Sequence, residues 1–485
     1  MRHFFMVNSR TIINSMIWKM FERFSSQIAT FIVSIILARI LLPSDYGIIA
    51  IILVFINIAN VIIDGGFNTA LIQKKSADKL DFSTIFWFCL LIALLLYGLF
   101  FLTAPIIAGF YDKQILCPVL RVLGLGIILN SYISIQYAYI SRNLIFRKQF
   151  YVNAVALVIS GTVGLIMAYS GFGVWSLVFQ SLSNSVTCAL LLWIVIKWRP
   201  TFSFSLGRFR GLFDYGWKIF VTNMIIAIYE NIRSMVVGKL YQPDVLAYFD
   251  RGKVLPDFTI NNVMTSIYAV LLPSFSAEQD NVGRVKQMMQ RSIKVSYLFV
   301  APLLIGLYFA AKGIVLVLLT EKWLPMVPFI QIFCIAYLLM PIQNINAISI
   351  RSLGYSNITL KLEIIKKILE AIILVVSFMI NVYAVAWGIV LYNFVSLFIN
   401  LYPSERLVDY GIFEQLKDVM PTLFISMIMG MIVYIIGLFS RDILLILLMQ
   451  ILIGASSYYL LCRMFKLDSL NYVLDYFRQV KNERR

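Results

Sequence analysis

Apolar runs long enough to cross a bilayer recur along the whole chain of 485 residues, separated by short polar connections. A helix needs about 20 consecutive apolar residues to span the hydrocarbon core, and in lipid it must satisfy its own backbone hydrogen bonds. The pattern predicts an all-α, polytopic membrane protein with about 14 transmembrane helices. These helices are expected over residues 14–40, 46–63, 83–108, 119–141, 151–170, 173–196, 214–240, 245–272, 293–319, 326–350, 362–380, 384–401, 420–439 and 442–463.

The first of these helices carries a line of polar residues along one face. Lys19, Arg23, Gln27, Thr30 and Ser34 follow one another at helical spacing, whereas the other faces are apolar. A helix surrounded by lipid must turn its charged face toward protein or water, so this line predicts a cavity wall. The alternative is that the two cations reach the cytoplasmic surface and the other polar groups make ordinary interhelical hydrogen bonds.

Other predicted helices also carry polar faces, and the last two carry almost none. The polar residues expected in a central cavity, besides Gln27 and Thr30, are Asn57, Asn60, Asn223 and Asn261. The fourth helix adds Asn130, Ser134, Tyr137 and Ser141 to the polar faces. A carboxylate that exchanges an ion for a cation can link ion binding to a change of state. Candidates for this coupling to Na⁺ or H⁺ are Asp64, Glu230 and Asp257.

A group of cations is expected within the membrane or at its rim. Its members are Arg23, Arg39, Arg233, Lys239, Arg251 and Lys253. Buried cations need anionic partners to offset their desolvation. The chain supplies some of these in Glu22, Glu230, Asp250 and Asp257. A bound diphosphate would supply the rest, since guanidinium groups match phosphate oxygens. The alternative is internal ion pairs that fix helix packing, for example Glu230 with Arg233.

Composition agrees with a membrane protein and changes how the charge is interpreted. The chain is 61% hydrophobic and 13% charged, with a mean hydropathy of +0.86. Its net charge of +17 could indicate nucleic acid, but Lys and Arg are typically retained in the cytoplasmic loops of membrane proteins. We therefore expect a lipid bilayer around the protein and no nucleic-acid partner. The distribution of basic loops predicts that both termini are cytoplasmic, with an uncleaved N-terminus.

The chain also carries signs of an internal repeat. The segment Ala38–Pro43 recurs as Gly238–Pro243, with a small residue, a cation and a proline in matching places. Because both copies begin in the cytoplasm, the pattern predicts two six-helix lobes related by a parallel pseudo-repeat around a central cavity. The predicted domains are 1–200 (helices 1–6), 201–405 (helices 7–12), 406–463 (two additional C-terminal helices) and 464–485 (a basic cytoplasmic tail).

Enzymatic chemistry has little support in the sequence. The chain has one histidine, His3, and its five cysteines lie far apart without metal-ligand spacing. It also lacks a glycine-rich phosphate loop followed by Lys and Ser or Thr. We expect no catalytic residues, no metal site, no cofactor and no enzyme activity.

Several segments carry a resemblance to a known family. ARILLPSDYGIIAIILVFINIANVIIDGGFNTALIQKK (Ala38–Lys75) resembles the start of bacterial polysaccharide transporters, the lipid-linked oligosaccharide flippases related to colanic acid and teichuronic acid exporters. The likeness continues through ISRNLIFRK (Ile140–Lys148), VWSLVFQ (Val174–Gln180), GKLYQPDVLAYFDRGKVLP (Gly238–Pro256) and RSLGYSNITLKLEIIKK (Arg351–Lys367). It covers most of the chain and weakens after about residue 403.

This resemblance implies the superfamily that also contains the multidrug and toxin extrusion antiporters and the peptidoglycan lipid flippases. It implies an alternating-access flippase of the bacterial inner membrane, which moves an undecaprenyl-diphosphate-linked oligosaccharide outward for cell-surface polysaccharide biosynthesis. A polysaccharide polymerase is an expected partner. The alternative function is an ion-coupled antiporter of small amphipathic molecules; a cavity dominated by cations favours the first. A membrane scaffold that transports nothing would not need aligned polar faces.

Overall fold

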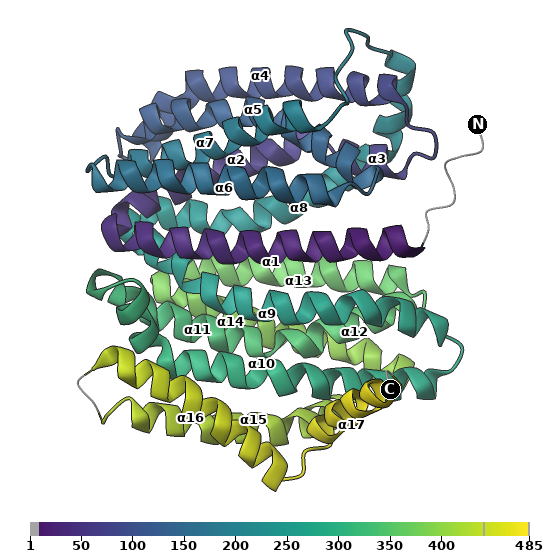
Figure 1. The fold of residues 1–485 in the computed structure, drawn as a ribbon. Coiled ribbons are helices and arrows are strands. Elements are labelled where there is room, and N and C mark those ends of the chain that lie inside the picture. The colour runs from purple at the N-terminus through teal and green to yellow at the C-terminus, as the bar shows by residue number, and fades with distance from the viewer. Residues whose placement is uncertain (1–8, 440–441, 484–485) are drawn as a thin grey trace. The chain divides into compact units, whose positions relative to one another are not determined.

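The computed structural model describes residues 9–439 and 442–483, and this part of the chain is helical without β-strands (Figure 1). In most helices the sequence supplies a continuous apolar run, and helices satisfy all but their terminal backbone groups internally. The elements are α1 (Ser9–Ile40), α2 (Pro43–Asp64), α3 (Phe67–Gln73), α4 (Lys79–Phe110), α5 (Leu116–Arg142), α6 (Phe146–Tyr169), α7 (Val174–Val195), α8 (Leu206–Leu240), α9 (Pro243–Ala277), α10 (Val282–Leu318), the 3₁₀ helix η1 (Glu321–Met326), α11 (Val327–Leu338), α12 (Met340–Ser352), α13 (Ser356–Phe378), α14 (Val382–Val408), α15 (Ile412–Ile436), α16 (Ile443–Met464) and α17 (Asp468–Glu483).

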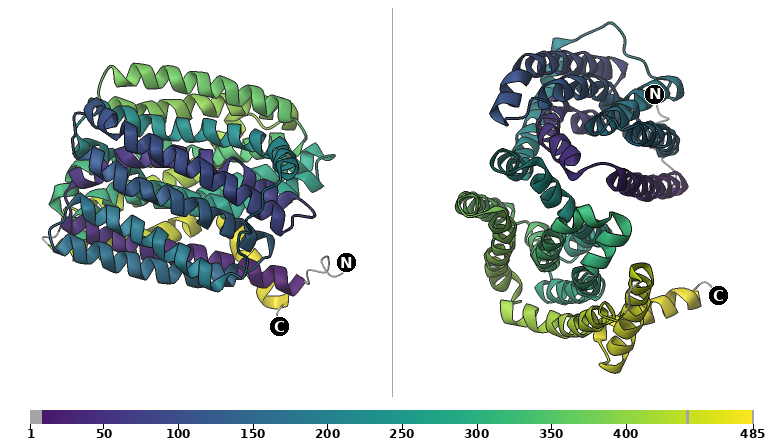
Figure 2. Two further views of the ribbon diagram at one scale, coloured as in Figure 1. Left: turned by 90° about the horizontal axis from the view of Figure 1, so that it is seen from above. Right: turned by 90° about the vertical axis from the view of Figure 1, so that its left-hand side faces the viewer.

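The all-α membrane fold expected from the sequence is confirmed. Within the described residues, eleven segments are long and apolar enough to cross a membrane. The predicted helices that fall outside this set are α8, α9 and α13, each of which carries several charged residues. The count of 14 therefore stays a prediction. In each half of the chain most helices run alongside one another, as the right-hand view of Figure 2 shows.

The chain divides into two compact units, Met1–Ala247 and Tyr248–Arg485. In the first unit, α8 packs against α2, α3 and α4, so this helix belongs by its contacts to the N-terminal unit. The observed division therefore lies beyond the predicted boundary near residue 200. This division describes packing and does not test which helices move together, so the predicted domains stay a prediction.

The two copies of the sequence repeat form the same local structure. α1 and α8 each end three residues before a proline, and that proline is the first residue of the next helix. Proline disfavours helical geometry at the preceding residue but suits the first position of a helix. In the first unit the corner is closely packed: a Cβ on Gly47 would lie 1.7 Å from the Pro243 carbonyl oxygen. Only glycine fits there without moving the backbone.

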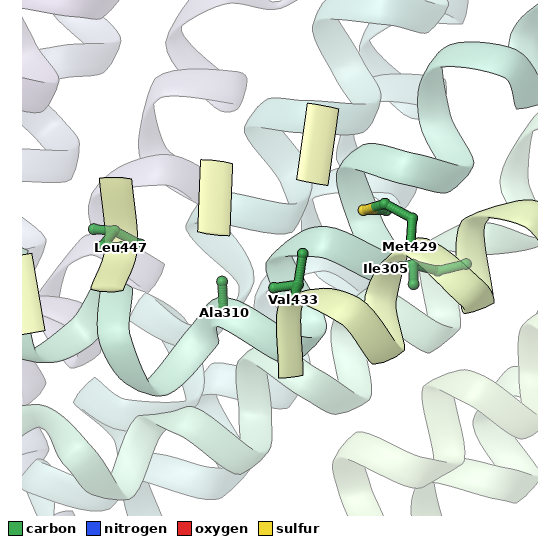
Figure 3. Close-up of a cluster of buried hydrophobic side chains, with 5 residues drawn as sticks. All are labelled: Ile305, Ala310, Met429, Val433 and Leu447. Carbon is green, nitrogen blue, oxygen red and sulfur yellow. The ribbon is translucent and has the colours of Figure 1, made fainter. Parts of the chain in front are cut away.

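In the second unit, α15 and α16 pack against α10 around a small apolar core. Figure 3 shows this cluster, which consists of Ile305, Ala310, Met429, Val433 and Leu447. Gly430 allows the close approach, since a Cβ there would lie 2.5 Å from the Phe309 ring. A second cluster extends the contact to α17: Leu467, the residue before this helix, packs with Leu298 and Ile425, and Leu470 and Val473 of α17 pack against the cluster. Much of the predicted tail, residues 464–485, is therefore helical.

Candidate functional site

The first unit contains an open cavity of about 490 Å³ between α2, α3, α5 and α8, with several polar side chains in its lining. Its volume lies in the range of small-molecule sites in proteins. It is lined by Asn60, Val61, Ile63, Asp64, Asn68, Ile72, Asn130, Ile133, Ser134, Tyr137, Ala138, Ser141 and Asn223. More than half of these residues carry a polar side chain, and one of them, Asp64, carries a charge. A polar interior in a lipid-facing bundle marks a functional site.

A paired-glycine turn builds one wall of this cavity. α2 ends at Asp64 because Gly65 and Gly66 both have left-handed backbones, with φ of 50° and 71°. A Cβ on Gly66 would lie 2.3 Å from the Gly216 carbonyl oxygen of α8. The turn therefore lets α8 approach and leaves the Asp64 carboxylate at the C-terminal end of α2, facing the cavity.

Arg142, the last residue of α5, holds the other end of this wall. Its guanidinium donates hydrogen bonds to the carbonyl oxygens of Leu71 (2.8 Å), Ile72 (3.1 Å), Lys74 (2.6 Å) and Lys75 (3.0 Å). Carbonyls at the end of a helix lack partners within the helix, and a cation there also suits the helix dipole. Arg142 thus fixes α3, which carries Asn68, to α5, which carries Ser134.

Two acceptor oxygens in this wall are buried without a hydrogen-bond partner. They are Oδ1 of Asp64 and Oδ1 of Asn68. The amide Nδ2 of Asn68 donates to the Ser134 hydroxyl oxygen, and the same hydroxyl lies beside the Asp64 carboxylate, as does the Gly66 N–H. Ser134 therefore brings the two side chains together, and each retains a free acceptor. Buried polar atoms are rarely left unpaired in proteins.

A hydrogen-bonded chain runs from the cavity to α1. Tyr137 donates to Oδ1 of Asn153 (2.6 Å), and Nδ2 of Asn153 donates to Glu22 (2.8 Å). Glu22 is only 8% exposed and pairs with Lys19 at 3.0 Å. A buried carboxylate needs such partners. Glu22, which the sequence suggested as an anionic partner for nearby cations, thus connects α1 through Asn153 of α6 to Tyr137 of the cavity wall.

Next to the cavity, a cluster of ion pairs joins α3, α4 and α8. Asp81, which is fully buried, lies 2.7 Å from Lys74 and 3.2 Å from Arg208, and Arg208 also pairs with Asp78 at 2.7 Å. Burial alone would raise the pKa of Asp78, but hydrogen bonds from the Asp81 and Leu80 backbone and from Arg208 lower it overall. The cluster fixes the start of α8 against the N-terminal end of α4.

The predicted cavity residues have different environments. Asn60, Asp64 and Asn223 line the observed cavity. Asn57 lies nearby and donates to Asn231 of α8 (3.3 Å). The remaining predicted polar and coupling residues are not among the lining residues; they are Gln27, Thr30, Glu230, Asp257 and Asn261. Asn68 was not among the predicted residues, although the glycine pair just before it could have indicated a turn next to the cavity. The polar face of α5 was predicted, but its residues were not assigned to the site.

The predicted cations do not line this cavity. Lys239 pairs with Asp112 at 3.1 Å and donates to the Phe110 carbonyl, and Lys253 pairs with Asp250 at 2.9 Å. Arg23 and Arg39 are exposed, whereas Arg233 and Arg251 are partly buried. Arg251 and Lys253 belong to the second unit and the others to the first. Their joint role as a diphosphate site stays a prediction.

The fold and the cavity define a multi-pass helical membrane protein. The chain belongs to the family described as polysaccharide biosynthesis protein, which matches residues 36–328. The resemblance seen in the sequence is therefore confirmed.

Curated relatives include the teichuronic acid biosynthesis protein TuaB of Bacillus subtilis (strain 168), which is 22% identical over 78% of each chain. The succinoglycan biosynthesis transport protein ExoT of Rhizobium meliloti (strain 1021) is 24% identical over 65% of this chain. The lipopolysaccharide biosynthesis protein WzxC of Escherichia coli (strain K12) is 23% identical over 64%. The matches span 64% and 63% of ExoT and WzxC, slightly less than two thirds of their lengths.

Two solved structures share the fold. The lipid II flippase MurJ, in an inward closed conformation, superposes with a TM-score of 0.76 over 94% of this chain and 100% of its own, at 17% identity. An inward-facing multidrug resistance transporter of the MATE family gives 0.63 over 79% of this chain and 94% of its own, at 14% identity. Identities this low establish the fold alone.

Proposed function

We propose that the protein is a flippase that moves an undecaprenyl-diphosphate-linked oligosaccharide across the bacterial inner membrane for cell-surface polysaccharide biosynthesis. The observation that carries the proposal is a polar cavity within a membrane protein of the polysaccharide biosynthesis family. Its relatives are named for the biosynthesis or transport of teichuronic acid, succinoglycan and lipopolysaccharide. Polar side chains inside a bundle let a hydrophilic head group leave water without entering lipid.

In this proposal the protein works by alternating access and carries out no covalent chemistry. The isoprenoid tail remains in lipid while the sugars and the diphosphate cross inside. Both termini lie in the cytoplasm, and a polysaccharide polymerase receives the exported unit. Arg23 and Arg233 of the first unit, and separately Arg251 of the second, are the arginines we propose for diphosphate binding. A guanidinium group forms paired, charge-assisted hydrogen bonds with phosphate oxygens.

The binding of substrate by the purified protein tests this proposal. The wild type is expected to bind an undecaprenyl-diphosphate sugar more tightly than the neutral undecaprenol. Each Arg→Ala change at the three positions removes a contact of roughly 1.5–3 kcal/mol, a loss of about ten- to a hundredfold in affinity. The matched Arg→Lys variants should recover part of the lost affinity, since they keep the positive charge but lose the paired N–H donors of the guanidinium group. Equal affinity for the neutral lipid, or unchanged affinity in all three Ala variants, would reject a diphosphate site at these residues.

One observation favours the second candidate, an ion-coupled antiporter of small amphipathic cations. The cavity of the first unit is lined by one carboxylate and by no Lys or Arg, so its field attracts cations. Counterflow of a radiolabelled organic cation into proteoliposomes separates the two functions. Uptake of the cation without movement of the lipid-linked sugar would favour the antiporter.

A further inference from the structure

The paired-glycine turn places a carboxylate at the electrostatically unfavourable end of a helix. Asp64 is the last residue of α2, where the carbonyl groups of the helix already contribute negative potential. A carboxylate at this end is disfavoured unless a positive charge lies beside it. None of the lining residues is Lys or Arg, and the guanidinium of Arg142, at the end of α5, is occupied by the carbonyls that follow Ala70.

The hydrogen-bond pattern also favours a cation beside Asp64. The amide donor of Asn68 is used by Ser134, so its carbonyl oxygen is left without a donor, as is Oδ1 of Asp64. Both oxygens are closed to bulk solvent and belong to residues around one hydroxyl. A buried acceptor that lacks a donor is costly. A carboxylate, an amide carbonyl and a hydroxyl are the hard oxygen ligands that small inorganic cations prefer.

We propose that Asp64, Asn68 and Ser134 bind a sodium ion at the C-terminal end of α2. One carboxylate offsets one positive charge, which fits a monovalent ion, whereas Ca²⁺ and Mg²⁺ usually take more charged ligands. A metal ion can contact several oxygens at once. Asp64 and Asn68 both contact the Ser134 hydroxyl, so the three side chains lie close together around the proposed ion.

The site deepens the proposed function, and only its use in coupling rests on that function. Ligands from α2, α3 and α5 are joined when the ion is bound, so the ion stabilises the arrangement in which these three helices meet. A ligand that binds one state better shifts the population toward that state. Among the three carboxylates predicted from sequence, Asp64 is the one that lines the cavity, and the coupling is therefore assigned to it.

Sodium-dependent thermal stability of the purified full-length protein tests the site directly. Melting is followed in NaCl and in choline chloride at equal ionic strength. Sodium is expected to raise the melting temperature of the wild type saturably. At ten times the dissociation constant, it lowers the unfolded-to-folded ratio about elevenfold. Asp64→Asn is expected to abolish the shift, and Asn68→Ala to move its midpoint to at least tenfold higher sodium.

Asp214→Asn is the matched control, because Asp214 is an exposed carboxylate on α8 in the same unit and does not line the cavity. It should keep the wild-type sodium response. Should Asp64→Asn fail to fold, Ser134→Ala replaces it, and binding of ²²Na⁺ is measured in parallel. A wild type without sodium response or ²²Na⁺ binding would overturn the proposal, as would an Asp64→Asn protein that retains them. Equal stabilisation by protons alone or by K⁺ would also overturn it. Because the readout is ion binding, its failure leaves the lipid-binding test intact.

Discussion

Arg142 offers the sharpest structural test of how the cavity wall is held. Of its four hydrogen bonds, those to the Leu71 and Lys74 carbonyls lie in partly buried surroundings, whereas those to Ile72 and Lys75 are exposed. Water can replace the exposed bonds when the side chain is removed. The two protected bonds involve a charged donor and are worth roughly 1.5–3 kcal/mol each, so Arg142→Ala should destabilise the α3 wall by about 3–4 kcal/mol after allowance for non-additivity.

The expected effect is local, since α3 is a short helix attached through this residue. A loss of about 3 kcal/mol corresponds to roughly a hundredfold faster opening, which hydrogen exchange of residues 67–75 measures by mass spectrometry. Arg142→Lys should recover part of the protection because it keeps a charged donor. Arg147→Ala is the control, since Arg147 is exposed and its guanidinium lies over the Trp18 ring. Unchanged exchange of residues 67–75 in Arg142→Ala would refute the account of this wall.

Three further predictions concern the fold, the topology and pH. Gly47→Ala should prevent correct packing of α2 against the start of α9 and lower the folded yield. The control Gly98→Ala, whose Cβ would meet nothing within 4 Å, should be neutral or stabilising. Equal folded yields of the two variants by size-exclusion chromatography would contradict this. Cysteines placed at Lys148 and Arg208 should react only with reagents that enter the cytoplasm, and one at Lys322 from outside; the opposite labelling would reject the topology. The lowered pKa of Asp78 stabilises the folded state above its unfolded pKa, and this contribution is lost as the pH falls through the folded pKa. Melting curves should therefore show an added loss of stability below about pH 4 that Asp78→Asn lacks.

The helices could be predicted from sequence wherever hydrophobicity alone decides the structure. Runs of apolar residues define α4 and α16, whose termini differ from the predicted ones by a few residues. The short α3 was missed because its seven residues follow a glycine turn and carry no periodic pattern of their own. The charges of α17 suggested a tail, whereas its Leu470 and Val473 pack against a buried cluster that includes Leu298 of α10.

The candidate site was only partly visible in the sequence. Asp64 and Asn60 could be found because polar groups stand out on an apolar helix, and both line the cavity. The partners of the cations could not be predicted in this way, because ion pairs form between residues that are far apart in the sequence. Lys239, for example, pairs with Asp112, which lies 127 residues earlier. Hydrophobic periodicity places residues on a helix face but does not say which helix that face meets.

The most direct test of the proposed function is transport of the lipid-linked sugar itself. The purified protein is reconstituted into liposomes that carry a fluorescent undecaprenyl-diphosphate oligosaccharide, and a membrane-impermeant glycosidase then reports which leaflet holds the sugar. Without protein, about half of the lipid should stay protected in the inner leaflet, because polar head groups cross hydrocarbon slowly. With the protein, the account predicts that nearly all of the lipid-linked sugar becomes cleavable. Continued protection of the inner-leaflet half, in vesicles shown to contain folded protein, would contradict a flippase function.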